Sequence, residues 1–222
     1  MRKILCILFF PIYLFSGNLD SLHFSIFGGI TINNYFSKDG LAISSSPFGF
    51  RGGIGIIRDM KSDFVFCSNI WYQNSQYNDI NTYIYDKYYS EQVRLNTNLK
   101  ISRLYWSAEV TKKLKKFYLG INTGVSYTLK SDVQQFVYSN STNANTNINL
   151  FNKYIVYSIV GKNLNPVLNP FVGVSISYYP TKRFGIKYEN NIDILASPYR
   201  QFAFIKPFHL FQNSITLTLK IK

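Results

Sequence analysis

The sequence predicts an all-β fold: a closed antiparallel eight-stranded transmembrane β-barrel with up-and-down topology, preceded by a signal peptide. Three observations support this prediction. The chain begins with a basic and then apolar segment, eight later segments alternate between apolar and polar residues, and the links between those segments alternate in length. The 222 residues are enough for a single domain. We therefore assign residues 1–17 to the signal peptide and residues 18–222 to the barrel domain.

The composition excludes several other classes of protein. Of all residues, 46% are hydrophobic and 16% are charged, and this charged fraction is well below the quarter that is usual in soluble proteins. No apolar run approaches the ~18 residues that a membrane-spanning helix needs. Two Cys and two His are too few soft ligands for a zinc cluster. We therefore expect neither a helical membrane protein nor a bound metal or cofactor.

The first residues have the pattern of a secretory signal peptide. A basic pair, Arg2 and Lys3, precedes an uninterrupted apolar run over residues 4–15, and two small residues follow that run. A buried first strand or a short helix is the alternative, but the run is uninterrupted rather than alternating, and an export signal also accounts for the basic flank. Cleavage after this segment would leave Cys67 as the remaining cysteine, so no intramolecular disulfide is expected.

The first four alternating segments are residues 24–33, 48–56, 64–72 and 93–101. Their apolar positions are Phe24, Ile26, Ile30, Ile32, Phe48, Phe50, Ile54, Ile56, Phe64, Phe66, Ile70, Tyr72, Val93, Leu95, Leu99 and Ile101. The residues between them are mostly small or polar, and the third segment shows the weakest contrast. A period of two is typical of a strand with one face in an apolar medium and the other in a polar one.

The second half of the chain repeats this arrangement in residues 119–127, 172–178, 184–193 and 214–221. The apolar positions there are Leu119, Ile121, Val125, Tyr127, Val172, Val174, Ile176, Tyr178, Phe184, Ile186, Tyr188, Ile192, Ile215, Leu217, Leu219 and Ile221. Counted with their flanking residues, the expected strands have about 9–12 residues, the length that crosses a bilayer when the strand is tilted.

The links between the segments alternate between long and short. Long links follow the odd segments and comprise residues 37–47, 74–90, 130–169 and 195–213. Residues 59–62 and 180–183 form short links, and residues 104–116 form an intermediate one. Outer-membrane barrels have short periplasmic turns and long outer loops. A β-sandwich also has alternating strands, but it gives no reason for this alternation of link lengths.

Residues 104–116 leave two interpretations open, because Tyr105, Ser107 and Glu109 keep the alternation of a strand. A separate ninth strand would place the two ends of the chain on opposite sides of the barrel. We favour eight strands and a basic periplasmic turn that contains Lys112, Lys113, Lys115 and Lys116.

Four segments resemble the eight-stranded outer-membrane β-barrel domain of Bacteroidetes-type bacteria, the group that includes the PorT-like proteins. They are residues 92–101, residues 117–129 with their two glycines, the hairpin 169–195, and the closing strand 212–222. The resemblance covers nearly the whole chain after the signal peptide and rests on compositional patterns. It implies a non-enzymatic outer-membrane protein with a structural, envelope-assembly or secretion-associated role.

The interior of an eight-stranded barrel is only wide enough for its own side chains, so an open channel is not expected. We expect four bases and two acids to pair inside as a packed polar network, because an unpaired charge there is costly. A narrow anion-favouring pore is the alternative. The residues of the predicted network are Arg51, Arg94, Lys100, Lys187, Glu189 and Asp193.

Catalysis is the competing class, since a small barrel could act on membrane lipids. A catalytic site needs a nucleophile with a base, or an acid and a base, within hydrogen-bond reach. His23 stands at the start of the first strand and His209 in the last predicted link, and no short motif joins either to a Ser and a carboxylate. We therefore expect that the protein is not an enzyme.

Residues 139–149 are rich in Asn and predict a solvated loop, so binding through the loops is a further alternative. Aromatic residues within 83–89 and 199–208 fit either an adhesive surface or, preferably, a girdle at the lipid headgroups. The 24 Lys and Arg are scattered, which favours attraction to anionic lipids over nucleic acid. The expected partners are outer-membrane lipids, with envelope or secretion-complex proteins as candidates; the sequence leaves the oligomeric state open.

Overall fold

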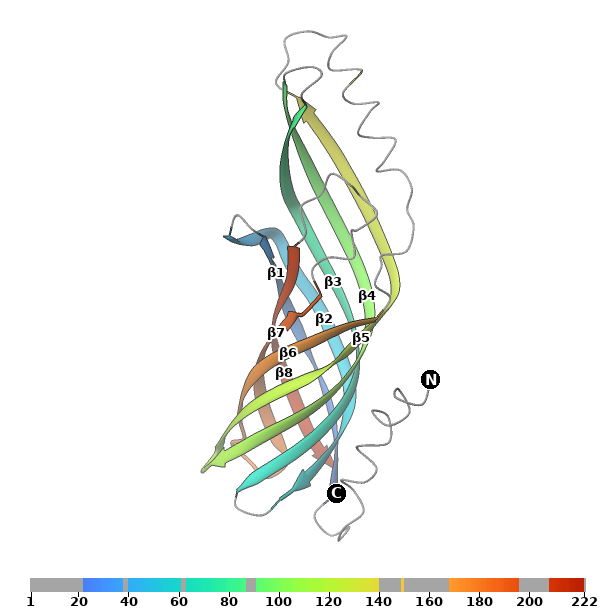
Figure 1. Cartoon of the computed structure of the whole chain (residues 1–222). Coiled ribbons are helices and arrows are strands. Elements are labelled where there is room, and N and C mark those ends of the chain that lie inside the picture. Colours follow the sequence, from blue (N-terminus) through green and yellow to red (C-terminus); the bar gives the residue numbers. More distant parts are fainter. Residues whose placement is uncertain are drawn as a thin grey trace, which may run out of the picture.

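The computed structural model describes residues 22–37, 40–60, 63–86, 91–139, 149, 168–195 and 208–221. The described residues form eight strands: β1 (Leu22–Ser37), β2 (Gly40–Asp59), β3 (Phe64–Asp86), β4 (Glu91–Leu114), β5 (Phe117–Ser139), β6 (Leu168–Tyr178), β7 (Phe184–Asp193) and β8 (Phe208–Ile221). Each strand pairs antiparallel with its neighbour in sequence, and β8 closes the barrel against β1 (Figure 1). The predicted closed eight-stranded antiparallel barrel is confirmed. Within the described residues, no helix is long and apolar enough to cross a membrane.

The predicted faces are correct along most of the barrel. Outward side chains such as Ile54 and Ile121 are 62% and 71% exposed, whereas inward Thr31 and Asn122 are 0% and 2% exposed. Large apolar side chains therefore cover the outside of the barrel, and most of the side chains that fill its interior are polar. This is the reverse of a soluble barrel, whose apolar face turns inward.

The fourth strand is where the predicted register is wrong. Leu99 and Ile101 were expected outside but are buried inside, and Lys100 between them is exposed. Leu99 pairs with Tyr77 of β3, which is also fully buried, so the interior is apolar at this level. The strand pairing is irregular on either side of this layer. The pairing of β3 with β4 shifts between Tyr77 and Ile80, and the pairing of β4 with β5 shifts between Ser102 and Arg103. Local alternation alone does not reveal such a layer, because apolar side chains there face an apolar interior instead of the apolar surroundings of the barrel.

Residues 104–116 belong mostly to β4 rather than to a turn. The strand runs on to Leu114, so Lys112 and Lys113 are strand residues and the turn itself is only Lys115 and Lys116. The strand count of eight is unchanged, because this segment continues the fourth strand instead of forming a ninth.

Two of the four predicted long links are mostly strand. Only residues 38–39 separate β1 from β2, and only residues 87–90 separate β3 from β4. In Figure 1, β3, β4 and β5 continue far beyond the rest of the barrel, and this extension accounts for much of the expected link length. We call the end of the barrel that carries this extension the loop end. The opposite turn end carries residues 60–63, 115–116 and 179–183 between strands, together with the start of β1 and the end of β8.

Glycine 53 makes room for a close approach of β2 and β3, and this gives a test of the interior packing. A Cβ on Gly53 would lie 2.2 Å from the carbonyl oxygen of Ile70 and 2.5 Å from the Cβ of Trp71. A Cβ on the neighbouring, outward Gly52 would meet its nearest atom, the Phe27 carbonyl oxygen, at 3.8 Å. We expect Gly53→Ala to destabilise the barrel by about 1–3 kcal/mol through overpacking, whereas Gly52→Ala stays near the wild-type value.

Urea unfolding in detergent micelles, followed by tryptophan fluorescence, measures both variants. Equal unfolding midpoints for Gly53→Ala and Gly52→Ala would contradict the tight approach at Gly53.

Candidate functional site

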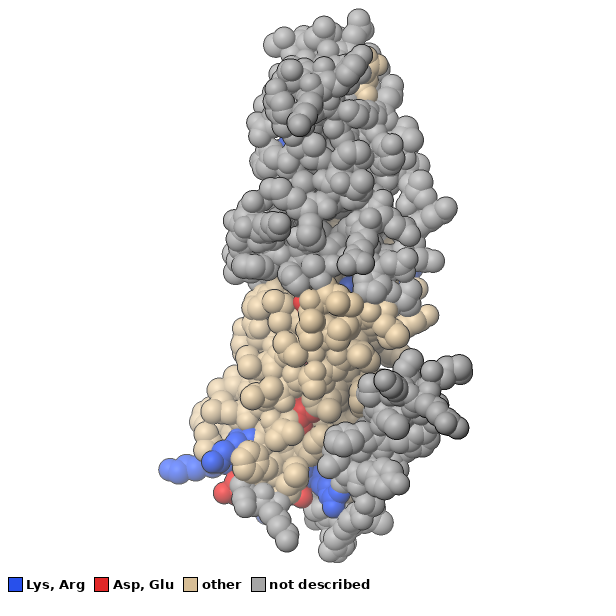
Figure 2. Space-filling view, viewed as in Figure 1, with Lys and Arg blue, Asp and Glu red and all other residues tan. Residues whose placement is uncertain are grey.

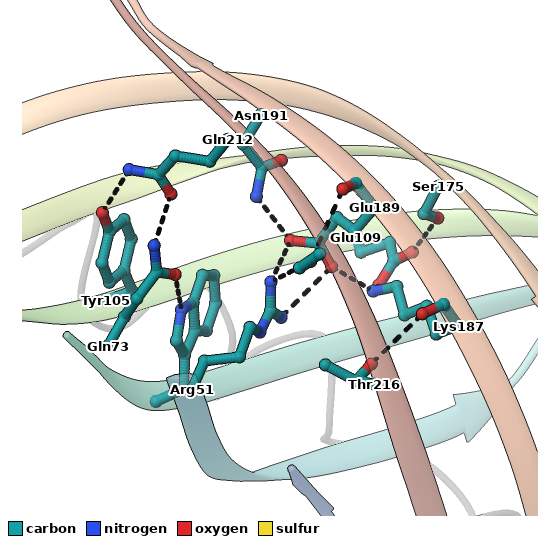
Figure 3. Close-up of polar contacts among 12 residues, drawn as sticks. Arg51, Gln73, Tyr105, Glu109, Ser175, Lys187, Glu189, Asn191, Gln212 and Thr216 are labelled. Carbon is teal, nitrogen blue, oxygen red and sulfur yellow. Dashed lines mark hydrogen bonds and ion pairs between the residues drawn. The ribbon is translucent and has the colours of Figure 1, made fainter. Parts of the chain in front are cut away.

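A chain of ion pairs crosses the interior of the barrel and joins β2, β7 and β4 (Figure 3). The Arg51 guanidinium donates to both carboxylate oxygens of Glu189, at 3.1 and 3.3 Å. The ammonium of Lys187 lies 2.8 Å from Glu189 and donates to Glu109 at 2.6 Å. Cations and carboxylates therefore alternate along this chain.

Neutral groups add further contacts to the charged ones. Arg51 also donates to the Ser214 hydroxyl at 2.8 Å, and its guanidinium lies 4.6 Å from the centre of the Trp71 ring. Asn191 donates to Glu189, and Ser175 donates to Glu109. A buried charge is tolerated when its remaining hydrogen-bonding positions are filled in this way.

A second ion pair lies nearer the loop end. Arg103 of β4 donates to Asp193 of β7 at 2.6 Å, and Asn169 of β6 donates to the same carboxylate oxygen at 3.1 Å. Among the described residues, three basic side chains inside the barrel thus meet three acidic ones. These six charges cancel, which argues against a conduit that favours anions at this level of the barrel.

Four aromatic rings pack together inside the barrel: Phe27, Trp71, Tyr105 and Phe171. Trp71 and Tyr105 stack with centroids 4.9 Å apart and planes within 5° of parallel, and Phe171 meets both rings edge-on. We call these residues the aromatic cluster. Each comes from a different strand, so the rings bridge the interior between β1, β3, β4 and β6.

Side-chain amides connect this cluster to the last strand. The Trp71 indole donates to Gln73 at 3.3 Å, Gln73 donates to Gln212 at 3.0 Å, and Gln212 donates to the Tyr105 hydroxyl at 2.8 Å. The polar edges of the two stacked rings are thereby satisfied without water (Figure 3).

The interior is packed toward the loop end and hollow toward the turn end. Around Tyr77, Arg103 and Gln212 there is no space for a water molecule. On the other side of the aromatic cluster, beside Arg51 and Lys187, there is a cavity of about 40 Å³. This volume holds water molecules but no larger solute.

Only part of the predicted polar network lies inside the barrel. Arg51, Lys187, Glu189 and Asp193 lie inside the barrel and form ion pairs there. Arg94 and Lys100, which were expected inside, have exposed side chains, so their predicted inward direction is wrong. Both stand on the part of β4 whose register the sequence did not reveal.

Sequence reasoning missed Arg103 and Glu109 as members of the network. The signal for them was present, because the alternation continues through Arg103, Tyr105 and Glu109. Extending the predicted register of residues 93–101 would have placed both charges outside, in the apolar medium. That contradiction showed that residues 99–101 had been assigned to the wrong face, since Leu99 and Ile101 lie on the same buried face of β4 as Arg103 and Glu109.

The two histidines are far less informative. His23 lies at the turn end, where its ring nitrogen Nε2 is 3.7 Å from a carboxylate oxygen of Asp59. His209 was expected in a link but belongs to β8, and its side chain lies outside the described residues, as do residues 140–148 of the Asn-rich segment.

Solved structures with a similar arrangement of strands are outer-membrane proteins. Neisserial surface protein A has a TM-score of 0.48 and 12% identity, over 89% of this chain and 97% of that one. The attachment invasion locus protein Ail of Yersinia pestis has a TM-score of 0.42 and 9% identity, over 90% and 98%. The N-terminal β-barrel domain of Pseudomonas aeruginosa OprF has a TM-score of 0.35 and 10% identity, over 88% and 97%. No protein-family model and no curated protein matches the chain. Since these TM-scores are below 0.5, they carry nothing about function.

The central carboxylate of the network provides a test of its contribution to stability. Glu189→Gln removes the charge that Arg51 and Lys187 share while keeping the shape of the side chain. Breaking a buried pair from one side leaves an uncompensated charge, and we expect a loss of about 3–5 kcal/mol in the free energy of unfolding.

Asp59→Asn, which removes an exposed carboxylate at the turn end, is the matched control and should change stability by less than about 0.5 kcal/mol. Adding Arg51→Met to Glu189→Gln should recover part of the loss, because the guanidinium would no longer be buried beside a neutral amide. Strictly additive losses in this double-mutant cycle would argue against the pairing.

Proposed function

We propose that this chain is an integral outer-membrane protein with a non-enzymatic structural, envelope-assembly or secretion-associated role. The observation that carries the proposal is the belt of large apolar side chains on the outside of the closed barrel. Exposed residues from every strand contribute to it, among them Ile26, Ile54, Ile70, Leu104, Ile121, Val174, Ile186 and Leu217. Water would make such a surface strongly unfavourable, whereas lipid chains solvate it.

The distribution of charge supports the same location. Exposed charged side chains occur at the turn end, as at Lys113 and Arg183, and at the loop end, as at Lys100 and Lys130. In Figure 2 the blue side chains gather at the turn end beneath a belt that is mostly tan. On β5 the belt runs from Phe117 to Leu129. These 13 residues make 12 steps of ~3.3 Å, which at a tilt of about 45° rise roughly 28 Å, comparable with the apolar band of an outer-membrane barrel.

The interior supports a structural role over transport or catalysis. Its charges balance, the aromatic cluster bridges it, and the cavity beside Lys187 is of water size. Both oxygens of Glu109 and of Glu189 accept from cations or from hydroxyl or amide donors, which fits carboxylates of structural ion pairs better than a free general base.

The finer parts of the proposal rest on the sequence. Residues 1–17, the predicted signal peptide, lie outside the described residues and support export to the outer membrane. The PorT-like resemblance supports envelope or secretion-complex proteins as partners, beside the lipids of the membrane. Affinity capture of the tagged chain from outer membranes would identify such partners.

Membrane insertion is tested by placing a charge in the belt. We expect the wild-type protein in the outer-membrane fraction with heat-modifiable migration, and Ile121→Arg to reduce the folded amount there severalfold. Arginine near the bilayer midplane costs about 2–4 kcal/mol. Met60→Arg is the matched control, because Met60 is also an exposed apolar residue but lies at the turn end. Recovery of the wild-type protein in the soluble fraction would refute the proposal.

The closed interior is tested by solute flux. Liposomes that contain the purified wild-type protein should release chloride no faster than liposomes without protein, because the aromatic cluster and the ion pairs fill the barrel. Trp71→Ala combined with Phe171→Ala removes two rings of the cluster and should raise the flux measurably. Steady chloride flux through the wild-type protein would instead support the anion-favouring pore.

A further inference from the structure

The turn end of the barrel contains a pocket that the interior network does not use. Its volume is about 400 Å³, which is within the range of small-molecule sites. Basic groups dominate its lining: Lys113, Lys182, Arg183 and Lys220, with the single carboxylate of Asp59 and the imidazole of His23.

Backbone hydrogen bonds fix the positions of these basic residues. The amide of Lys220 donates to the carbonyl of Arg183 at 2.7 Å, which joins the end of β8 to the link before β7. The amide of Lys113 donates to the carbonyl of Asp63 at 2.7 Å and joins β4 to the link before β3. The cations therefore converge from three separate segments that are held together at the rim.

Lys220 is the innermost of the four cations. Its ammonium lies 3.9 Å from the centre of the Tyr179 ring and 5.1 Å from that of Tyr118. It lines both this pocket and the water-sized cavity above it, and no carboxylate pairs with it in the part of the chain that the structure describes. A partly buried ammonium that has ring faces but no anion beside it favours an anionic ligand.

The one carboxylate in the pocket does not neutralise it. Asp59 is 58% exposed, and the ring nitrogen Nε2 of His23 lies 3.7 Å from its carboxylate. The four cations therefore leave the pocket strongly positive even with this carboxylate ionised. The pocket also includes Ile221, an outward residue of the apolar belt, so it reaches the edge of the belt.

We propose that this pocket binds a phosphate group of a small phosphorylated molecule or of a phospholipid headgroup. Two or more negative oxygens match convergent lysines, and a guanidinium donates to them in pairs. The position of Ile221 gives the acyl chains of a phospholipid a path into the belt, and this version rests on the membrane location proposed above. A free phosphate compound needs only the basic rim.

The test uses the full chain, folded in lauryldimethylamine oxide micelles that contain no phosphate. Calorimetric titration with inorganic phosphate measures the soluble ligand. Native mass spectrometry of the protein released from phosphatidylcholine nanodiscs with added phosphatidic acid measures the lipid. Lys182→Gln combined with Arg183→Gln should weaken binding at least tenfold in whichever arm shows it, and Lys220→Met should do the same while keeping the stem that packs on the tyrosines.

Lys100→Gln combined with Lys130→Gln removes the same charge at the loop end and should change binding less than twofold. Phosphatidic acid retained without inorganic phosphate binding identifies the lipid source, and the reverse result identifies a soluble ligand. Loss of binding that is equal in the rim and control variants, or no binding in either arm, overturns the proposal. Heat-modifiable migration of every variant reports folding separately, so failure at the rim is distinguishable from failure of the membrane assignment.

Discussion

The structure depends on neutralising charge inside a closed barrel. A charged side chain that points inward has no route to bulk water, and leaving it unpaired costs several kcal/mol. The carboxylate of Glu189 meets this constraint by accepting from Arg51 and Lys187 together, and Lys187 in turn reaches Glu109. These residues stand on β2, β7 and β4, so the pairs form only when three strands are in register around the barrel. Because a slip by one residue turns every side chain to the other face, the ion pairs select one register against its neighbours.

The aromatic cluster depends on a different condition, which is free space beside each ring. Trp71 occupies the space beside Gly53. The Phe171 ring lies so close to Gly124 that a Cβ on this glycine would be 2.8 Å from the ring atom Cζ. A large ring on one strand therefore packs into the space that a glycine leaves on the neighbouring strand. The rings supply the dispersion energy that polar side chains lack, while the glycines let the strands approach closely enough to keep the interior filled. This pairing explains why the inward glycines are structural requirements rather than weak points of the strands.

Much of the fold was predictable from local alternation, because in seven of the eight predicted segments the apolar positions mostly face outward. Val174 and Asn122 follow that rule, and so do Lys187 and Glu189. The rule failed at Leu99, Lys100 and Arg94 because polarity does not change monotonically along the interior: an apolar layer around Tyr77 lies beyond the ion pairs. Which acid pairs with which base was not predictable either. Arg103 finds Asp193 across 90 positions of sequence, and only the closure of the barrel brings such partners together.

Because the interior is filled, the function is expected at the outer surfaces of the barrel. Its two ends have different surfaces. At the loop end, β3, β4 and β5 continue as a three-stranded extension whose pairing reaches Asp86 with Glu91 and Val93 with Ser139. Beyond Asn74, β3 has no pairing with β2 among the described residues, so one backbone edge of the extension has no strand partner there. An edge of this kind can pair with a strand of another protein. Such an edge would suit the structural or assembly role proposed above, which needs contact with other proteins but no path through the barrel.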